Sequence, residues 1–67
     1  MKISKSKLNI ALAAAVMNYS DLRKAAGISS LTGKHIKNCP QYDFKPKTVG
    51  KVAKALDVTP EYLTEES

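Results

Sequence analysis

The sequence has few of the residues on which enzymes and metal proteins depend. Cys39 is its single cysteine and His35 its single histidine, in a chain of 67 residues. One cysteine excludes an intrachain disulfide framework and a cysteine-rich zinc site, and it fits reducing, cytoplasmic surroundings. With no motif that cradles a phosphate or binds a metal, we expect no catalysis, no cofactor, no metal ion and no small-molecule ligand.

Long hydrophobic runs are also missing. No segment reaches the roughly 20 apolar residues that cross a bilayer, so we expect no membrane partner. The most apolar stretch, residues 8–17, follows Lys2, Lys5 and Lys7, an order that secretory signals share. Asn9 interrupts this stretch, and its leucines and alanines recur at the helical spacing i, i+3, i+4, i+7. We therefore predict a helix of the folded domain here rather than a cleaved signal.

Acidic residues are scarce until the end of the chain. Residues 1–56 contain all eleven lysine and arginine residues but only two acids, Asp21 and Asp43, which gives them a formal charge of +9. Residues 57–67 contain four acids and no lysine or arginine, a formal charge of −4. A basic body suits a polyanionic partner such as DNA or RNA, although surface charge can also serve only to keep a protein soluble.

Local signals predict two short helices joined by a tight turn. Asn18 is a suitable N-cap, and Asp21 lies at N3, where its charge suits the helix dipole. Gly27 can adopt the left-handed conformation that ends a helix, and Ser29 can cap the next one. The two predicted helices cover residues 19–26 and residues 30–37.

Three further helices complete an all-α prediction. Alanine-rich sequence favours the first, apolar spacing predicts another after the loop that contains Pro40, and Thr59 followed by Pro60 begins a short last one. Within the fourth helix Gly50 costs about 1 kcal/mol relative to alanine, so we expect close packing to require it. We predict a single domain over residues 1–67, with residues 64–67 as a frayed tail. The first predicted helix runs from residue 4 or 5 to 16 and the fourth from residue 47 to 56. The short last helix starts at residue 60 and contains Tyr62 and Leu63.

Two segments resemble a known family of DNA-binding proteins. Residues 21–30 (DLRKAAGISS) look like the second helix, turn and cap of the phage Cro and repressor-type (XRE-like) helix-turn-helix family. Residues 52–63 (VAKALDVTPEYL) resemble that family's fourth helix, turn and fifth helix. The resemblance covers about residues 8–63. It implies a compact, five-helix, lambda-repressor-like domain that acts as a sequence-specific regulator of transcription on double-stranded DNA, such as a Cro-like repressor of a phage or mobile element.

The resemblance also implies how DNA would be bound. Residues near the start of the second motif helix reach base edges in the major groove, and here that helix covers residues 30–37. On matching positions, the residues that would contact bases are Ser29, Ser30, Leu31 and His35, and Lys34 would contact a base or a phosphate. The start of the preceding helix would hold a phosphate. The implied phosphate contacts are Tyr19, Lys37, Asn38, Lys45 and Lys47.

Two positions depart from the family's pattern. The chain has Arg23 where the family often has a small alanine, although the run of residues 21–25 (DLRKA) resembles one branch of the family. The more serious departure is Gly33, where the family usually has a Val, Ile or Leu buried between the two motif helices. Glycine leaves that space unfilled. Either Leu31 turns inward to fill it, or the aliphatic stem of Arg23 covers it, and either arrangement would rotate or loosen the helix.

Two expectations concern protein partners. Family members often bind DNA as dimers, and we expect at least weak homodimerisation around Tyr62 and Leu63, while Tyr42 and Phe44 would pack in the core or in a dimer interface. The alternative function is a protein-binding module of the same fold, such as an anti-repressor, an antitoxin or a partner of another regulator. Salt separates these hypotheses, because binding through several phosphates weakens steeply as salt rises.

Overall fold

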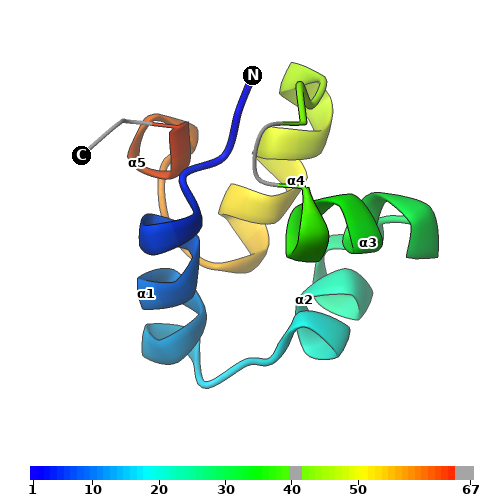
Figure 1. Ribbon diagram of the computed structural model, residues 1–67. Coiled ribbons are helices and arrows are strands. Elements are labelled where there is room, and N and C mark those ends of the chain that lie inside the picture. The colour runs from blue at the N-terminus through cyan, green and yellow to red at the C-terminus, as the bar shows by residue number, and fades with distance from the viewer. Residues whose placement is uncertain (40–41, 65–67) are drawn as a thin grey trace.

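A computed structural model of the chain describes residues 1–39 and 42–64. Within these residues the chain forms five helices and no strand (Figure 1). No helix in this part of the chain is both long enough and apolar enough to cross a membrane. The all-α, five-helix prediction is confirmed. The helices are α1 (Lys5–Ala15), α2 (Tyr19–Ala26), α3 (Ser30–Asn38), α4 (Pro46–Ala55) and α5 (Pro60–Thr64).

Asn18 and Gly27 act as expected at the two ends of α2, and Asp21 adds a hydrogen bond that was not predicted. The side chain of Asn18 accepts a hydrogen bond from the backbone N–H of Asp21 at 2.8 Å, and the Asp21 carboxylate accepts one from the Asn18 N–H at 3.3 Å. This reciprocal capping box satisfies N–H groups that the start of a helix leaves unpaired. At the other end Gly27 is left-handed, with φ +66° and ψ +36°, a conformation that glycine adopts without steric cost.

The other helices lie within about one residue of their predicted bounds. Ser4 caps α1, and Val16 ends it in the left-handed conformation with φ +55°. α3 continues through Asn38, one residue beyond its predicted end. α4 starts at Pro46 and ends at Ala55, each one residue earlier than predicted. Proline suits the first helical position because its φ is preset and its missing N–H would be unpaired there anyway.

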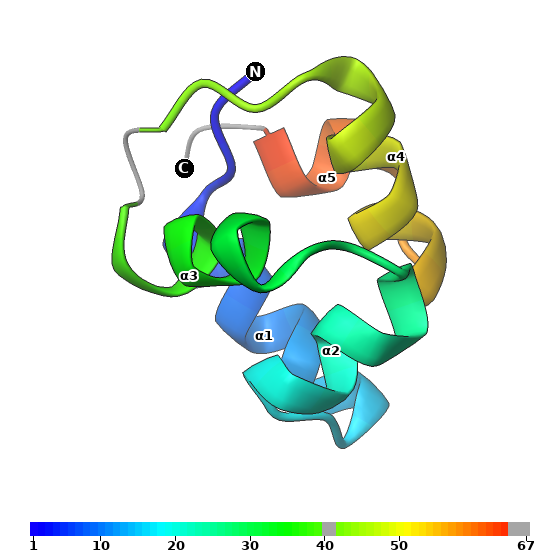
Figure 2. The ribbon, with the colours of Figure 1, turned by 90° about the vertical axis from the view of Figure 1, so that its right-hand side faces the viewer.

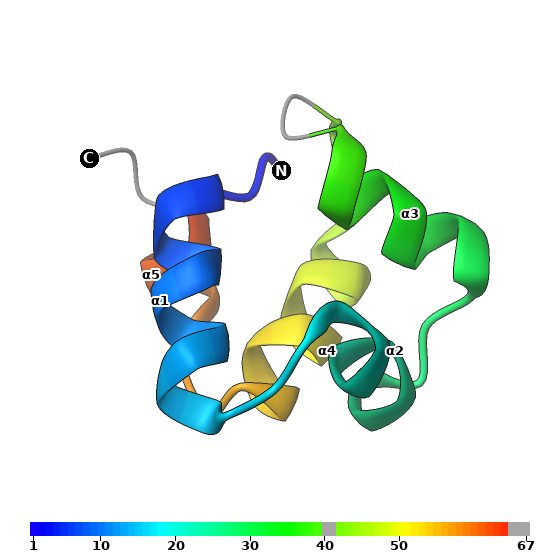
Figure 3. The same ribbon diagram turned by 60° about the horizontal axis from the view of Figure 1, so that its bottom comes forward.

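The helices pack around one apolar core to which all five contribute. α1 and α5 lie together on one side of the molecule, α2 and α3 lie on the other, and α4 lies between them (Figure 3). Figure 2 looks onto the side where α2 and α3 lie in front of the other helices. The buried residues are Ile3, Leu8, Ala11, Leu12, Leu22, Ile36, Phe44, Val49, Val52, Ala53, Leu56 and Leu63.

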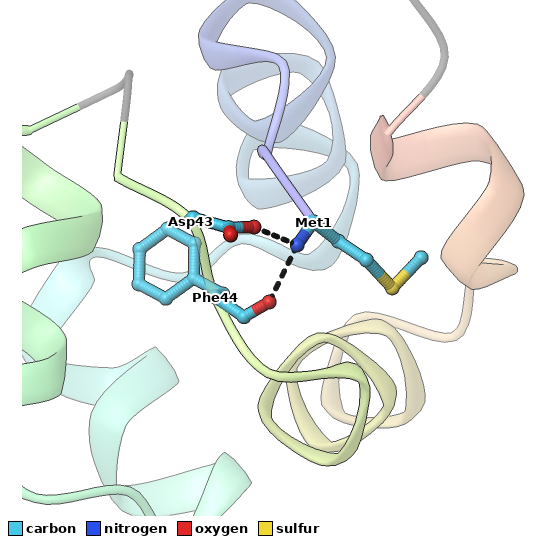
Figure 4. Close-up of polar contacts among 3 residues, drawn as sticks. All are labelled: Met1, Asp43 and Phe44. Carbon is cyan, nitrogen blue, oxygen red and sulfur yellow. Dashed lines mark hydrogen bonds and ion pairs between the residues drawn. The ribbon is translucent and has the colours of Figure 1, made fainter.

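The N-terminal segment joins α5 to the loop that follows α3. The backbone N–H of Ser4 donates to the carbonyl of Leu63 at 2.7 Å, and that of Phe44 donates to the carbonyl of Met1 at 2.6 Å. The amino group of Met1 donates to the Phe44 carbonyl at 2.6 Å and pairs with the Asp43 carboxylate (Figure 4). Its hydrogen bond and charge lower the pKa of Asp43. These contacts fix the loop directly before α4.

Two expectations about local structure are corrected. Close packing does not require Gly50, because a Cβ there would meet no described atom outside its own stretch of helix within 4 Å. Thr64 does not belong to a frayed tail, because it is the last residue of α5 and its hydroxyl donates to the Pro60 carbonyl at 2.9 Å. The rest of the predicted tail, residues 65–67, lies outside the described residues.

Candidate nucleic-acid interface

A short, closed turn sets the orientation of α3 relative to α2. Gly27, Ile28 and Ser29 separate the two helices, and the backbone N–H of Ile28 donates back to the carbonyl of Arg23 at 3.2 Å. Ser29 then caps α3, since its Oγ accepts from the backbone N–H of Thr32 at 3.2 Å. Because hydrogen bonds close the turn at both ends, the two helices form a helix-turn-helix unit of fixed geometry.

α3 has one side in the core and one side in solvent. Ile36 anchors it in the core and is 3 % exposed, whereas Leu31 is 64 % exposed. Apart from Leu31, the fully exposed residues of the helix are polar or basic. A helix with such a face has the size and the donor groups to enter the major groove of DNA. The exposed residues are Ser30, Leu31, Lys34, Lys37 and Asn38.

An open groove with a volume of about 300 Å³ lies between α2 and α3. None of the described residues that line it is acidic, and three of them are cations. Positive charges around one groove favour an anionic ligand, because the walls of the groove concentrate the electric field of the charges that line it. The lining consists of Tyr19, Ser20 and Arg23 from α2 and of Ser30, Gly33, Lys34, Lys37 and Asn38 from α3.

Half of the residues predicted to contact DNA line this groove. Ser29 and Leu31 are exposed at the start of α3 but are not part of the lining. Lys45 and Lys47 are exposed at the start of α4, after the loop that follows α3, and they also lie outside the lining. The predicted residues that the groove brings together are Tyr19, Ser30, Lys34, Lys37 and Asn38.

His35 is engaged by the loop that follows α3. Its ring stacks on Tyr42 with centroids 4.1 Å apart and 20° between the planes, and Tyr42 contacts Phe44 at 4.7 Å between centroids. The stack connects the last turn of α3 to Phe44, which is buried in the core. A base contact by His35, as the family pattern implies, would therefore use the edge of a ring that already has one face covered.

Tyr19 is held at the groove by contacts with α1. Its hydroxyl donates to Oδ1 of Asn9 at 3.0 Å, and its ring centroid lies 5.1 Å from Nζ of Lys5. The Lys5 ammonium also donates to the carbonyl of Lys37, in the last turn of α3. Lys5 thus joins α1 to both motif helices. Sequence reasoning missed this role because the partners of Lys5 are distant along the chain and no local signal marks them.

Arg23 occupies the space that Gly33 leaves between the motif helices. A Cβ at residue 33 would lie 3.3 Å from Cδ and 3.5 Å from Cγ of Arg23. The alternative in which Leu31 turns inward is wrong, because that side chain is 64 % exposed. The same packing makes Arg23 part of the groove lining, although Arg23 is not among the residues predicted to contact DNA.

The two residues predicted for a dimer interface differ in exposure. Leu63 is 0 % exposed within its own chain, so it is a core residue and presents no surface to a second copy. Tyr62 is half-buried, and Nζ of Lys7 lies 5.0 Å from its ring centroid. A dimer contact at this end of the molecule would therefore involve Tyr62 and not Leu63.

Comparison with known proteins establishes the class of this chain. The family model of the Cro/C1-type helix-turn-helix DNA-binding domain matches residues 7–65, which is most of the chain. The chain therefore belongs to the Cro/C1-type helix-turn-helix family, and it is a DNA-binding regulator of that class. Searches of curated proteins and of solved structures gave no significant match.

Proposed function

We propose that the protein is a sequence-specific regulator that occupies an operator in double-stranded DNA, with α3 in the major groove. The observation that supports this proposal is that the exposed face of α3 adjoins the cationic groove. Ser30, Lys34 and Lys37 belong to both surfaces. A helix that reads bases needs phosphate-binding groups beside it, because phosphate contacts fix its register on the duplex.

The exposed side chains of α3 suit two different roles in this complex. Ser30 can donate to or accept from a base edge, and the exposed Leu31 can contact the methyl group of a thymine. Lys34 and Lys37 bring positive charge to the phosphates that border the groove. Base contacts would determine which operator is preferred, and phosphate contacts would determine affinity and its dependence on salt.

Occupation of the operator is the proposed regulatory step. A bound protein excludes other proteins from the same stretch of DNA, which is how a Cro-like repressor would act. Dimers of helix-turn-helix proteins bind half-sites about 34–36 Å apart. We therefore include a weak homodimer with contacts around Tyr62 in the proposal, since two copies side by side would match such an operator.

Single alanine variants of the two groove lysines test the proposal. Lys34→Ala and Lys37→Ala should weaken binding to every duplex, and removing the charge that neutralises one phosphate should reduce the slope of log K against log salt by about 0.9. Lys54→Ala is the matched control, because Lys54 is an exposed cation in the last turn of α4 and lies outside the groove lining. The measurement is a fluorescence anisotropy titration of labelled duplex at several salt concentrations.

Two outcomes would contradict the proposal. If both groove variants keep the parental affinity and slope, α3 does not face the phosphate backbone. If the parental protein binds no duplex at low salt, the protein-binding alternative becomes the better account, and an affinity capture of protein partners should follow.

A further inference from the structure

We propose that Arg23 binds a backbone phosphate of DNA in the groove between α2 and α3, through its guanidinium group. The inference rests on the proposed function and adds to it a phosphate-binding residue. Arg23 is not among the residues that the resemblance assigned to DNA, and the matching position often holds a small alanine in the family. In this chain the stem of Arg23 lies in the space left by a second departure from the pattern, the glycine at residue 33.

Packing fixes the course of the Arg23 side chain. Successive atoms of its stem approach the site of a Cβ at residue 33, with Cβ at 3.8 Å, Cγ at 3.5 Å and Cδ at 3.3 Å. The side chain therefore runs from α2 toward α3 across the space that Gly33 leaves open. A stem that is already packed loses less conformational freedom when the guanidinium binds a ligand, which favours binding.

The charge of Arg23 lacks an anionic partner within the described part of the protein. Arg23 is half-buried and lines the groove together with Lys34 and Lys37. It forms no ion pair with any carboxylate of the described residues. Three cations line this groove with no acid among the described lining residues, and they attract an anion from outside the chain.

A DNA phosphate is the anion that this arrangement fits. The guanidinium presents two parallel N–H donors that match two phosphate oxygens, whereas a lysine ammonium acts as a point charge. Ser20 and Ser30 line the same groove, and their hydroxyl groups can donate to the same phosphate. The groove adjoins the exposed face of α3, so the phosphate bound there would border the bases that α3 contacts.

Variants that keep the stem but remove the charge separate this role from packing. Arg23→Met and Arg23→Gln both retain side-chain atoms at the positions of Cβ, Cγ and Cδ, and neither carries charge. We expect each variant to fold as the parent does, as judged by far-ultraviolet circular dichroism and thermal melting. Each should make the slope of log K against log salt concentration less steep by about 0.9. Arg23→Lys should keep the slope but bind several-fold more weakly, because an ammonium cannot make the bidentate contact. Lys54→Met, which removes one exposed charge outside the groove, is the control and should keep the parental slope.

A direct probe distinguishes contact from an effect on the position of α3. In NMR spectra of the protein with a random-sequence duplex of 20 base pairs, the side-chain Nε–H signal of Arg23 should shift and become protected from exchange. A parental slope that persists in both Arg23→Met and Arg23→Gln, or an Nε–H signal that DNA leaves unchanged, would overturn the inference while leaving the proposed function in place. Failure of the parental protein to bind the duplex would overturn both, and the parental titration shows which case applies.

Discussion

Gly27 and Gly50 lie in such different surroundings that the same substitution should have opposite effects on stability. Gly50 lies inside α4, and a Cβ there would meet no described atom outside its own stretch of helix within 4 Å. Gly27 ends α2 in the left-handed conformation, with φ +66°. Gly50→Ala therefore adds a methyl group to open space in a regular helix, whereas Gly27→Ala places a side chain where the backbone conformation disfavours one.

The expected size of each effect follows from these conformations. In a helix interior, alanine is more favourable than glycine by about 0.8–1.0 kcal/mol. For a domain of this length, 1 kcal/mol shifts Tm by roughly 4–8 °C, so Gly50→Ala should raise Tm by several degrees. A left-handed conformation costs a non-glycine residue about 1–2 kcal/mol, so Gly27→Ala should lower Tm even though alanine restricts the unfolded chain by about 0.4–1 kcal/mol.

Thermal and urea unfolding followed by far-ultraviolet circular dichroism measures both differences. Gly33→Ala is an informative third variant, because its Cβ would lie 3.3 Å from Cδ of Arg23 and the arginine must yield by a few tenths of an ångström. Its stabilisation should therefore be smaller than that of Gly50→Ala. If Gly50→Ala lowers the free energy of unfolding, a neighbour packs against that face of α4 and the surroundings assigned to Gly50 are wrong.

Three other predictions follow from the capping box, the ion pair of Asp43 and the partial exposure of Tyr62. Asn18→Ala removes the cap of α2 and should lower the free energy of unfolding by about 1 kcal/mol, as measured by urea titration; an unchanged midpoint would mean that the cap contributes nothing. Folding lowers the pKa of Asp43 from its ordinary 3.8. The ionised carboxylate therefore stabilises the folded protein at pH values above 3.8, and this stabilisation is lost as the pH falls through the lower pKa of the folded state. Asp43→Asn should therefore reduce Tm at neutral pH and match the parental protein in strong acid, and a difference in Tm that grows toward low pH would show the opposite sign. Tyr62→Ala should weaken self-association on operator DNA, as measured by sedimentation; a strict monomer for the parental protein, free and on DNA, would exclude the dimer.

The fold was largely predictable because its signals are local. The Asn18 and Asp21 capping box, the left-handed Gly27 and the Ser29 cap each depend on residues within one turn of helix. α4 begins at Pro46, one residue earlier than predicted, because proline is itself a favourable first helical residue. Such local signals predict helix bounds well in a small all-α domain, because most of its helices begin at a capping residue that neighbours them in the sequence.

The candidate site was only partly predictable because its geometry depends on contacts between distant segments. The family pattern indicated five of the groove residues, but the stem of Arg23 beside Gly33 could be chosen over an inward Leu31 only once α2 and α3 were placed. Stacking of His35 on Tyr42 likewise joins a helix to a loop. Spacing along a chain predicts which residues lie on the same face of a helix. It does not show which of two side chains fills a gap between two helices.

Selection of bound sequences from a random duplex pool, at about 50 and about 200 mM salt, tests the central proposal most directly. The proposal predicts that one motif is enriched at both concentrations and that affinity falls steeply, by about 10³-fold for six phosphate contacts over this range. Salt-sensitive binding without an enriched motif would contradict base reading by α3. The absence of binding at either salt concentration would contradict the proposal that this chain acts on operator DNA.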